Sequence, residues 1–196
     1  MLTDNTAGSI ADNLYVALIH YPVMNKRGQT AGSAITTIDL HDIARASRTF
    51  GVRGFYVVTP YEDQAELAEQ VMGHWTRGVG STLNPDRKQA LELVRITPGF
   101  DDMLEEIEKE NRVPAMVVAT SAKTTAGTVS IEQLKKQAEN EVPHVLVFGT
   151  AWGLADPIID RCTHILDPIE GNTGYNHLSV RSAASIYLDR MINDRQ

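Results

Sequence analysis

The sequence predicts an α/β fold with a mainly parallel sheet and helices on both faces. Short runs rich in valine and isoleucine recur along the chain, and they lack the strict alternation of a half-exposed strand. Such runs are typical of strands buried on both faces of a sheet. Segments with apolar residues at helical spacing separate them, and this alternation indicates an α/β domain.

These patterns place the elements in chain order. The strands are expected at residues 14–19, 54–58, 94–96, 115–119, 145–148 and 163–166. Helical stripes are expected at Leu40, Ile43, Ala44 and Ser47; at Ala68, Val71, Met72 and Trp75; at Phe100, Met103, Leu104 and Ile107; and at Ile131, Leu134 and Ala138. A last helix is expected from Ser179 through Tyr187 to Met191.

Capping residues mark several helix ends. Gly51 follows the first helix, at a position where a left-handed conformation is favoured. Asp156 and Pro157 suit the N-cap and first position of a short helix, and Ser179 suits the N-cap of the last one. Residues 77–82 contain two glycines and are expected to form a mobile loop.

The composition is that of an ordinary globular domain. The chain has 196 residues, 42% of them hydrophobic, and one cysteine, Cys162. These values suit a single domain over residues 1–196 and exclude a disulfide scaffold. We expect a reducing, cytoplasmic setting and neither a signal peptide nor a membrane-spanning helix.

The charge balance restricts how the chain can bind nucleic acid. With 18 Lys and Arg against 25 Asp and Glu, the formal net charge is −7. Broad neutralisation of phosphates usually needs a basic excess, so an RNA partner must be met by a local patch. Candidates for such a patch are Lys26 and Arg27, Arg45 and Arg48, Arg77, and Arg87 with Lys88.

Several common site signatures are absent from the sequence. No G-x-G-x-x-G follows the first strand and no P-loop occurs, which disfavours dinucleotide and P-loop phosphate binding. The six histidines show no metal-ligand spacing, so no metal site is expected. Cys162 is interpreted as a small core residue rather than a nucleophile.

Two glycine-bearing loops in the last quarter are the strongest functional candidates. A strand ending near residue 148 runs into residues 149–154, and residues 169–178 lie between the next strand and the last helix. Glycine allows main-chain groups in such loops to approach a flat ligand closely. Two ordinary turns are the alternative interpretation.

These loops resemble motifs of the SPOUT superfamily of S-adenosylmethionine (SAM) dependent RNA methyltransferases. Residues 148–154 (FGTAWGL) match the second motif, residues 176–184 (NHLSVRSAA) the third, and residues 42–52 (DIARASRTFGV) more faintly the first. The nearest subgroup is a small bacterial domain that also occurs joined to tRNA guanine-N1 methyltransferase. The resemblance implies a C-terminal trefoil knot, whereas connection statistics alone favour an unknotted sheet.

The resemblance also implies where SAM binds. In the superfamily the adenosyl group is held mostly by main-chain groups of the knot loops, which is consistent with the absence of a Rossmann fingerprint. The implied cofactor contacts are Ala119, Thr120 and Ser121; Gly149, Trp152 and Gly153; and Ile169, Gly171 and Leu178.

The residues implied for catalysis depart in part from the superfamily pattern. Arg45 matches the arginine of the first motif, and His177 and Ser179 lie in the third, where His177 stands in place of a common asparagine. The second motif lacks its acidic residue, so the reaction type and the general base stay open. Carboxylate candidates for the base are Asp156, Asp167 and Glu170.

The expected partners are structured RNA, either tRNA or rRNA, and a second copy of the chain. RNA is expected to contact Arg45, Arg48, Arg77 and Arg181. Small residues in the last helix, and the pairing of superfamily members through this region, predict a homodimer. Trp75 and Trp152 are candidates for stacking on a base, with core packing the favoured interpretation for Trp75.

Two other classes of function stay open. A SAM-binding sensor or partner domain without transfer activity is favoured by the acidic charge and by the missing acidic residue of the second motif. An unknotted, flavodoxin-like binding protein would make the resemblance accidental.

Overall fold

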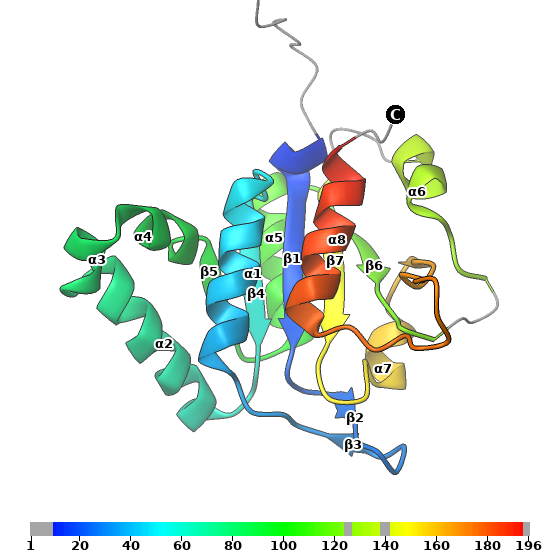
Figure 1. The fold of residues 1–196 in the computed structure, drawn as a ribbon, viewed down its shortest axis with the longest axis horizontal. Coiled ribbons are helices and arrows are strands. Elements are labelled where there is room, and N and C mark those ends of the chain that lie inside the picture. The colour runs from blue at the N-terminus through cyan, green and yellow to red at the C-terminus, as the bar shows by residue number, and fades with distance from the viewer. Residues whose placement is uncertain (1–9, 124–126, 138–141, 194–196) are drawn as a thin grey trace, which may run out of the picture.

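The fold is built on one sheet of six parallel strands. The computed structural model describes residues 10–123, 127–137 and 142–193. The strands are β1 (Leu14–Ile19), β4 (Gly54–Val58), β5 (Val94–Thr97), β6 (Met116–Ala119), β7 (His144–Gly149) and β8 (His164–Ile165). They pair in the order β5-β4-β1-β7-β6-β8 (Figure 1). The predicted parallel sheet is confirmed.

Helices cover both faces of this sheet, as predicted. The helical elements are the 3-10 helix η1 (Ile10–Asn13), α1 (Thr37–Thr49), α2 (Glu62–Thr76), α3 (Gly80–Leu83), α4 (Pro85–Leu91), α5 (Phe100–Asn111), α6 (Ile131–Gln137), α7 (Asp156–Ile159) and α8 (Val180–Ile192). α1 and α8 lie side by side on one face, and α5 lies behind the sheet (Figure 1). Ala138, expected in the fourth helix, lies outside the described residues.

The central strand β1 is buried along its whole length. Alternate residues from Leu14 join an apolar cluster with side chains of α1 and α8, and those from Tyr15 join a second cluster with side chains of α5. Each face of the sheet therefore has its own core, which explains why the strand sequences do not alternate between apolar and polar residues.

Two of the predicted helix caps are confirmed and one is wrong. Gly51 follows α1 with a φ of +73°, and the Ser179 hydroxyl accepts the Ser182 N–H at the start of α8. The N-cap of α7 is Ala155 rather than Asp156. The main-chain N–H of Ala155 donates to the Pro22 carbonyl at 3.4 Å, so tertiary contact fixes the chain one residue before the expected cap.

The expected loop over residues 77–82 is also partly wrong, because α3 begins within it. A Cβ on Gly80 would lie 2.6 Å from the Trp75 ring, and one on Gly78 would lie 2.8 Å from the His74 carbonyl oxygen. The glycines here permit close packing of α3 against the end of α2. They predicted a flexible loop in the sequence, but in the structure they serve this packing.

The structure adds elements that sequence patterns did not predict. A hairpin of β2 (Val23–Met24) and β3 (Thr30–Ala31) interrupts the connection between β1 and α1, and α3 and α4 extend the connection between β4 and β5. Each hairpin strand has two residues, too few for a periodic pattern. Strand order does not by itself define a knot, so the trefoil knot stays a prediction.

We expect the buried residues of β7 to contribute much of the stability of the sheet. Leu146 is fully buried between Val16 and Val118 of the neighbouring strands. Leu146→Ala should lower the free energy of unfolding by about 2–5 kcal/mol, because it leaves a cavity in the core. Leu83→Ala is the matched control, since Leu83 is 77% exposed and should change stability by less than about 0.5 kcal/mol. Urea unfolding of both variants measures the difference, and equal losses would contradict this account of the core.

Candidate functional site

The structure brings the three predicted cofactor segments to one edge of the sheet. Parallel register places Gly149 beside Ile19 and places Ala119 beside both Val147 and Ile165. The carboxyl ends of β7, β6 and β8 are therefore adjacent, and the loops that follow them leave from the same edge. In open α/β sheets this edge is where ligands bind.

The loop after β7 needs glycine for its own backbone. A Cβ on Gly149 would lie 2.6 Å from the Leu154 nitrogen and 2.7 Å from the Gly153 carbonyl carbon. Gly153 has a φ of +107°, a conformation that other residues rarely adopt, and Ala151 is left-handed at +53°. The close approach expected at Gly149 is thus an approach of the loop to itself.

The β2–β3 hairpin is hydrogen-bonded to this loop through main-chain groups. The Met24 N–H donates to the Gly153 carbonyl at 2.9 Å, and the Trp152 N–H donates to the Met24 carbonyl at 3.0 Å. Val23 and Leu154 form an antiparallel bridge beside them. The loop is therefore paired in the manner of a short strand and has a fixed shape without any ligand.

The second predicted loop, residues 169–178, is held by fewer hydrogen bonds to the rest of the described structure. Ile169 packs against the core, whereas Gly171 and Leu178 are exposed. The Asn176 amide donates to the Ala122 carbonyl at 3.0 Å, which joins this loop to the segment after β6. In that segment Thr120 is held by the β7 edge, since its hydroxyl donates to the Val147 carbonyl at 3.0 Å.

A partly buried polar network lies where β1 and β7 end. The Thr150 hydroxyl donates to the Ile19 carbonyl at 3.0 Å and lies 2.5 Å from Ser33 Oγ, which lies 3.0 Å from His20 Nδ1. Each hydroxyl has one proton, so Ser33 donates to Thr150 and accepts from His20 Nδ1–H. Burial lowers the pKa of His20, which favours the neutral imidazole over the charged form.

The sequence analysis did not predict this network. His20 directly follows a buried strand, and a polar residue in that position could have indicated it. His20 is fully buried, and its Nε2 has no partner among the described residues. The network connects the β1–α1 connection to Thr150 in the predicted cofactor loop, and it fixes the first residues of that loop.

Among the described residues, no hydrogen bond joins the predicted catalytic residue Arg45 to His177 or Ser179. Ser179 is occupied as the α8 N-cap, with its Oγ 2.9 Å from Ser182 Oγ, and His177 is exposed nearby. Arg181 donates to Asp39 at 3.1 Å and lies 3.5 Å from an oxygen of Asp42, so its guanidinium already has two carboxylate partners. These contacts join the first turns of α8 and α1.

Arg45 lies on another side of α1, where it faces α4. It lines a polar hollow of about 400 Å³ together with Arg48, Arg87, Asn84, Asp86 and Gln89. Three arginines and one carboxylate therefore share this space, which suits an anion. Arg87 was noted in the sequence only as part of a basic pair, and the fold places it beside Arg45 and Arg48.

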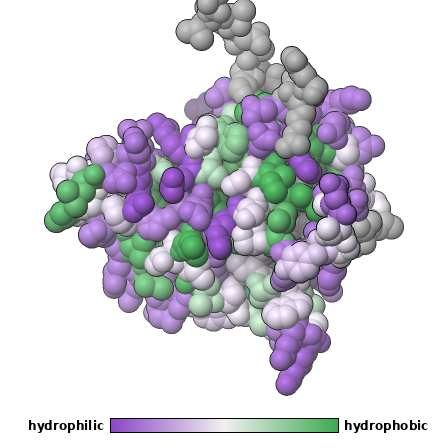
Figure 2. Space-filling view, viewed as in Figure 1, coloured by the Kyte–Doolittle hydropathy of each residue, from purple (hydrophilic) through white to green (hydrophobic). Residues whose placement is uncertain are grey.

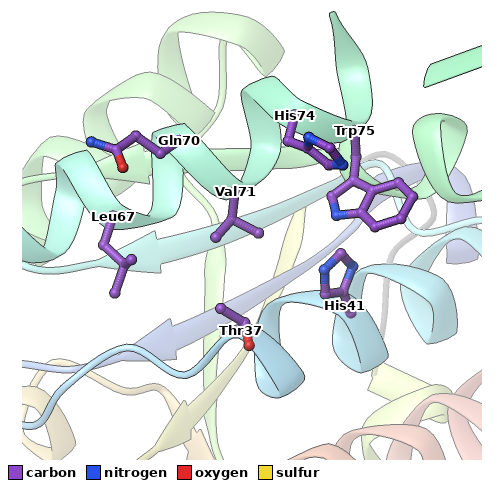
Figure 3. Close-up of a pocket in the computed structure, with 7 residues that line it drawn as sticks. All are labelled: Thr37, His41, Leu67, Gln70, Val71, His74 and Trp75. Carbon is purple, nitrogen blue, oxygen red and sulfur yellow. The ribbon is translucent and has the colours of Figure 1, made fainter. Parts of the chain in front are cut away.

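A second hollow, of about 420 Å³, lies between α1 and α2 and is more apolar. Figure 3 shows His41 and His74 on either side of the Trp75 indole, at ring-centroid distances of 5.7 and 4.9 Å. The Arg87 guanidinium stacks on the same indole at 4.3 Å. Trp75 also packs against the core, as predicted, and this hollow contains none of the implied cofactor contacts.

Other site classes find little support in the described part of the chain. Burial raises the pKa of the Cys162 thiol to about 11, so this cysteine stays protonated near neutral pH. Over residues 10–123, 127–137 and 142–193, no group of three His, Cys, Asp or Glu side chains could hold a metal ion. None of the helices described is long and apolar enough to cross a membrane.

Comparison with known sequences gives a consistent result. A family profile described as SAM-dependent RNA methyltransferase matches residues 13–193. Two tRNA (guanine-N(1)-)-methyltransferases are similar, from Oleidesulfovibrio alaskensis (46% identity over 182 residues) and Nitratidesulfovibrio vulgaris (45% over 185); each alignment covers 93% of this chain and 42% of the relative. The chain thus spans about two fifths of their length. An uncharacterized Aquifex aeolicus protein is 36% identical over 94% of this chain and 90% of its own.

Solved structures share the fold at low sequence identity. A probable methyltransferase from Bordetella pertussis has a TM-score of 0.63 at 15% identity and covers 93% of both chains. The SpoU methyltransferase AviRb from Streptomyces viridochromogenes, in complex with AdoMet, has a TM-score of 0.58 at 17% identity, over 93% of this chain and 57% of that one. The expected similarity to SPOUT enzymes is confirmed, and from the profile and the relatives together the chain belongs to the SAM-dependent RNA methyltransferase family.

Proposed function

We propose that this chain transfers a methyl group from SAM to a nucleotide of structured RNA. The observation that carries the proposal is the meeting of three loops at the carboxyl ends of β6, β7 and β8, in a chain whose family uses SAM. Two relatives named as tRNA methyltransferases favour tRNA over rRNA as the acceptor.

The residues at this edge suit the adenosyl group. A Cβ on Gly153 or Gly171 would meet no atom within 4 Å, so the main chain there faces open space. Ile169 offers apolar surface at the start of the second loop. SAM supplies an activated methyl group, so the chain's own residues are left to orient the acceptor and to take up its proton.

His177 and Arg45 are the proposed acceptor-side residues. His177 is exposed at the cofactor loops, where its imidazole can hydrogen-bond the acceptor or take up its proton. Arg45 faces a hollow beside α4 rather than these loops. We therefore propose that the chain acts as a homodimer, in which a second copy supplies the arginine for the same acceptor.

A SAM-binding domain without transfer activity is the second candidate. The second motif has residues 150–152 (TAW), without the acidic residue that is common there in the superfamily. Incorporation of a labelled methyl group into unmodified tRNA, with SAM binding measured in parallel, separates the two candidates.

We predict that SAM binds at the second loop in contact with Gly171. Gly171→Val fills space that no protein atom occupies, so it should weaken SAM binding at least ~10-fold without disturbing the fold. Gly174→Val is the matched control in the same loop, also without neighbours within 4 Å. Calorimetric titration measures both, and unchanged binding by Gly171→Val would remove Gly171 from the site. A flat titration of the natural protein would exclude both candidate functions.

Arg45 and Arg48 are predicted to bind RNA phosphates. Each change to alanine should weaken tRNA binding and lower the slope of log affinity against log salt by about one, because one phosphate contact is lost. Affinity for SAM should stay the same. Lys109→Ala, an exposed cation on α5, is the control. Natural affinity and slope in both arginine variants would show this face of α1 to be ordinary solvated surface.

The proposed dimer predicts complementation between inactive variants. Arg45→Ala and His177→Ala should each lose methyl transfer, and an equimolar mixture exchanged between subunits should recover about a quarter of the natural rate. Half of the dimers are then mixed, and each mixed dimer has one complete site. No recovery in a mixture shown by sedimentation to contain mixed dimers would mean that each site uses one chain only.

A further inference from the structure

Trp152 differs from most tryptophans in a folded chain because its side chain is largely outside the core. It is 60% exposed, whereas Trp75 is half-buried against the core. Its main-chain N–H is already used by the Met24 carbonyl, at 3.0 Å. The fold therefore uses the backbone of Trp152 and leaves much of the indole in solvent, where it is accessible to a ligand.

Two cations lie at the tip of the hairpin that binds this residue. Lys26 and Arg27 are both exposed, and no carboxylate of the described residues lies within ion-pair distance of either. They follow Met24, the residue bonded to Trp152, by two and three positions. Figure 2 shows the hairpin as a hydrophilic projection at the lower right of the molecule.

The hairpin tip has a defined shape. The Asn25 side-chain oxygen accepts the N–H of Arg27 at 2.8 Å and that of Gln29 at 3.1 Å. Gly28 completes the turn with a φ of +73°. The two cations therefore stand on an ordered turn rather than on a loose loop.

Both ends of the β1–α1 connection are also fixed to the loop that contains Trp152. Ser33, which follows the hairpin, contacts Thr150 at 2.5 Å, and Val23 at its start bridges Leu154. The main chains of Trp152 and of the hairpin that carries the two cations are thus fixed to each other before any ligand binds. A surface prepared in this way loses little conformational entropy when it binds.

We propose that Trp152 stacks on an unpaired base of the RNA while Lys26 and Arg27 bind the flanking phosphates. This inference rests on the proposed function, and it assigns Trp152 to the acceptor RNA instead of to the cofactor. An exposed aromatic ring beside paired cations is the combination that binds single-stranded nucleic acid, since every base has a face for stacking. The site also supplies a local cationic patch in a chain with a net charge of −7.

Fluorescence tests the proposal, because the chain has two tryptophans. In Trp75→Phe the remaining signal comes from Trp152, and unmodified bulk tRNA should quench it strongly, while SAM alone should not. Free tryptophan measured with the same tRNA is the control for absorption by the RNA, because Trp75 stacks under Arg87 at a hollow that is also proposed to bind RNA. Quenching of Trp152 by SAM, or tRNA binding without quenching, would overturn the assignment.

Binding measurements on the natural chain and its variants complete the test. Trp152→Ala should weaken tRNA binding roughly 5- to 150-fold, and Trp152→Phe should recover most of it because phenylalanine also stacks. Lys26→Gln with Arg27→Gln should lower the salt slope by about 1.4, the value for two phosphates on a single strand. Calorimetry should give natural SAM affinity for all of them.

The outcomes separate this inference from the proposed function. Natural tRNA affinity in Trp152→Ala, or loss of SAM affinity with tRNA binding unchanged, would overturn the stacking role and leave methyl transfer standing. Failure of the natural chain to bind either SAM or tRNA would overturn both.

Discussion

The parallel pairing of β1 with β7 is the constraint on which the rest of the site depends. Its register sets Ile19 beside Gly149, so the residues after both strands leave the sheet next to each other. Thr150 can then donate to the Ile19 carbonyl and meet Ser33, which in turn meets His20. One backbone register thus brings together segments more than a hundred positions apart in the sequence.

The hairpin after β1 depends on the same register, because it pairs with the loop after β7. Its strands have two residues each, too few to be stable alone. Their edge is completed by the loop after β7 through Met24 and Gly153. The hairpin and the loop therefore stabilise each other, and the positive φ values at Ala151 and Gly153 are maintained by this pairing.

Positive side chains cluster in particular regions of the surface, although the net charge of the chain is negative. Acidic side chains outnumber basic ones. Even so, Arg45, Arg48 and Arg87 share one hollow, and Lys26 and Arg27 share one turn. Arg181, by contrast, lies against Asp39 and Asp42 and joins α8 to α1. Positive charge is thus gathered at the hollow beside α4 and at the hairpin turn, while the ion pairs of Arg181 join two helices.

The sequence by itself determined the class of fold and most of its elements. Continuous apolar strands and helical stripes report burial directly, because side-chain periodicity follows from local backbone geometry. It also located the two glycine-bearing loops and, through their motifs, the family. Only the tertiary structure showed that Gly149 has no room for a side chain beside Leu154, that Arg87 joins Arg45, and that Met24 is hydrogen-bonded to Trp152. Each of these is a contact between residues distant in the chain, and local periodicity contains no information about such distances.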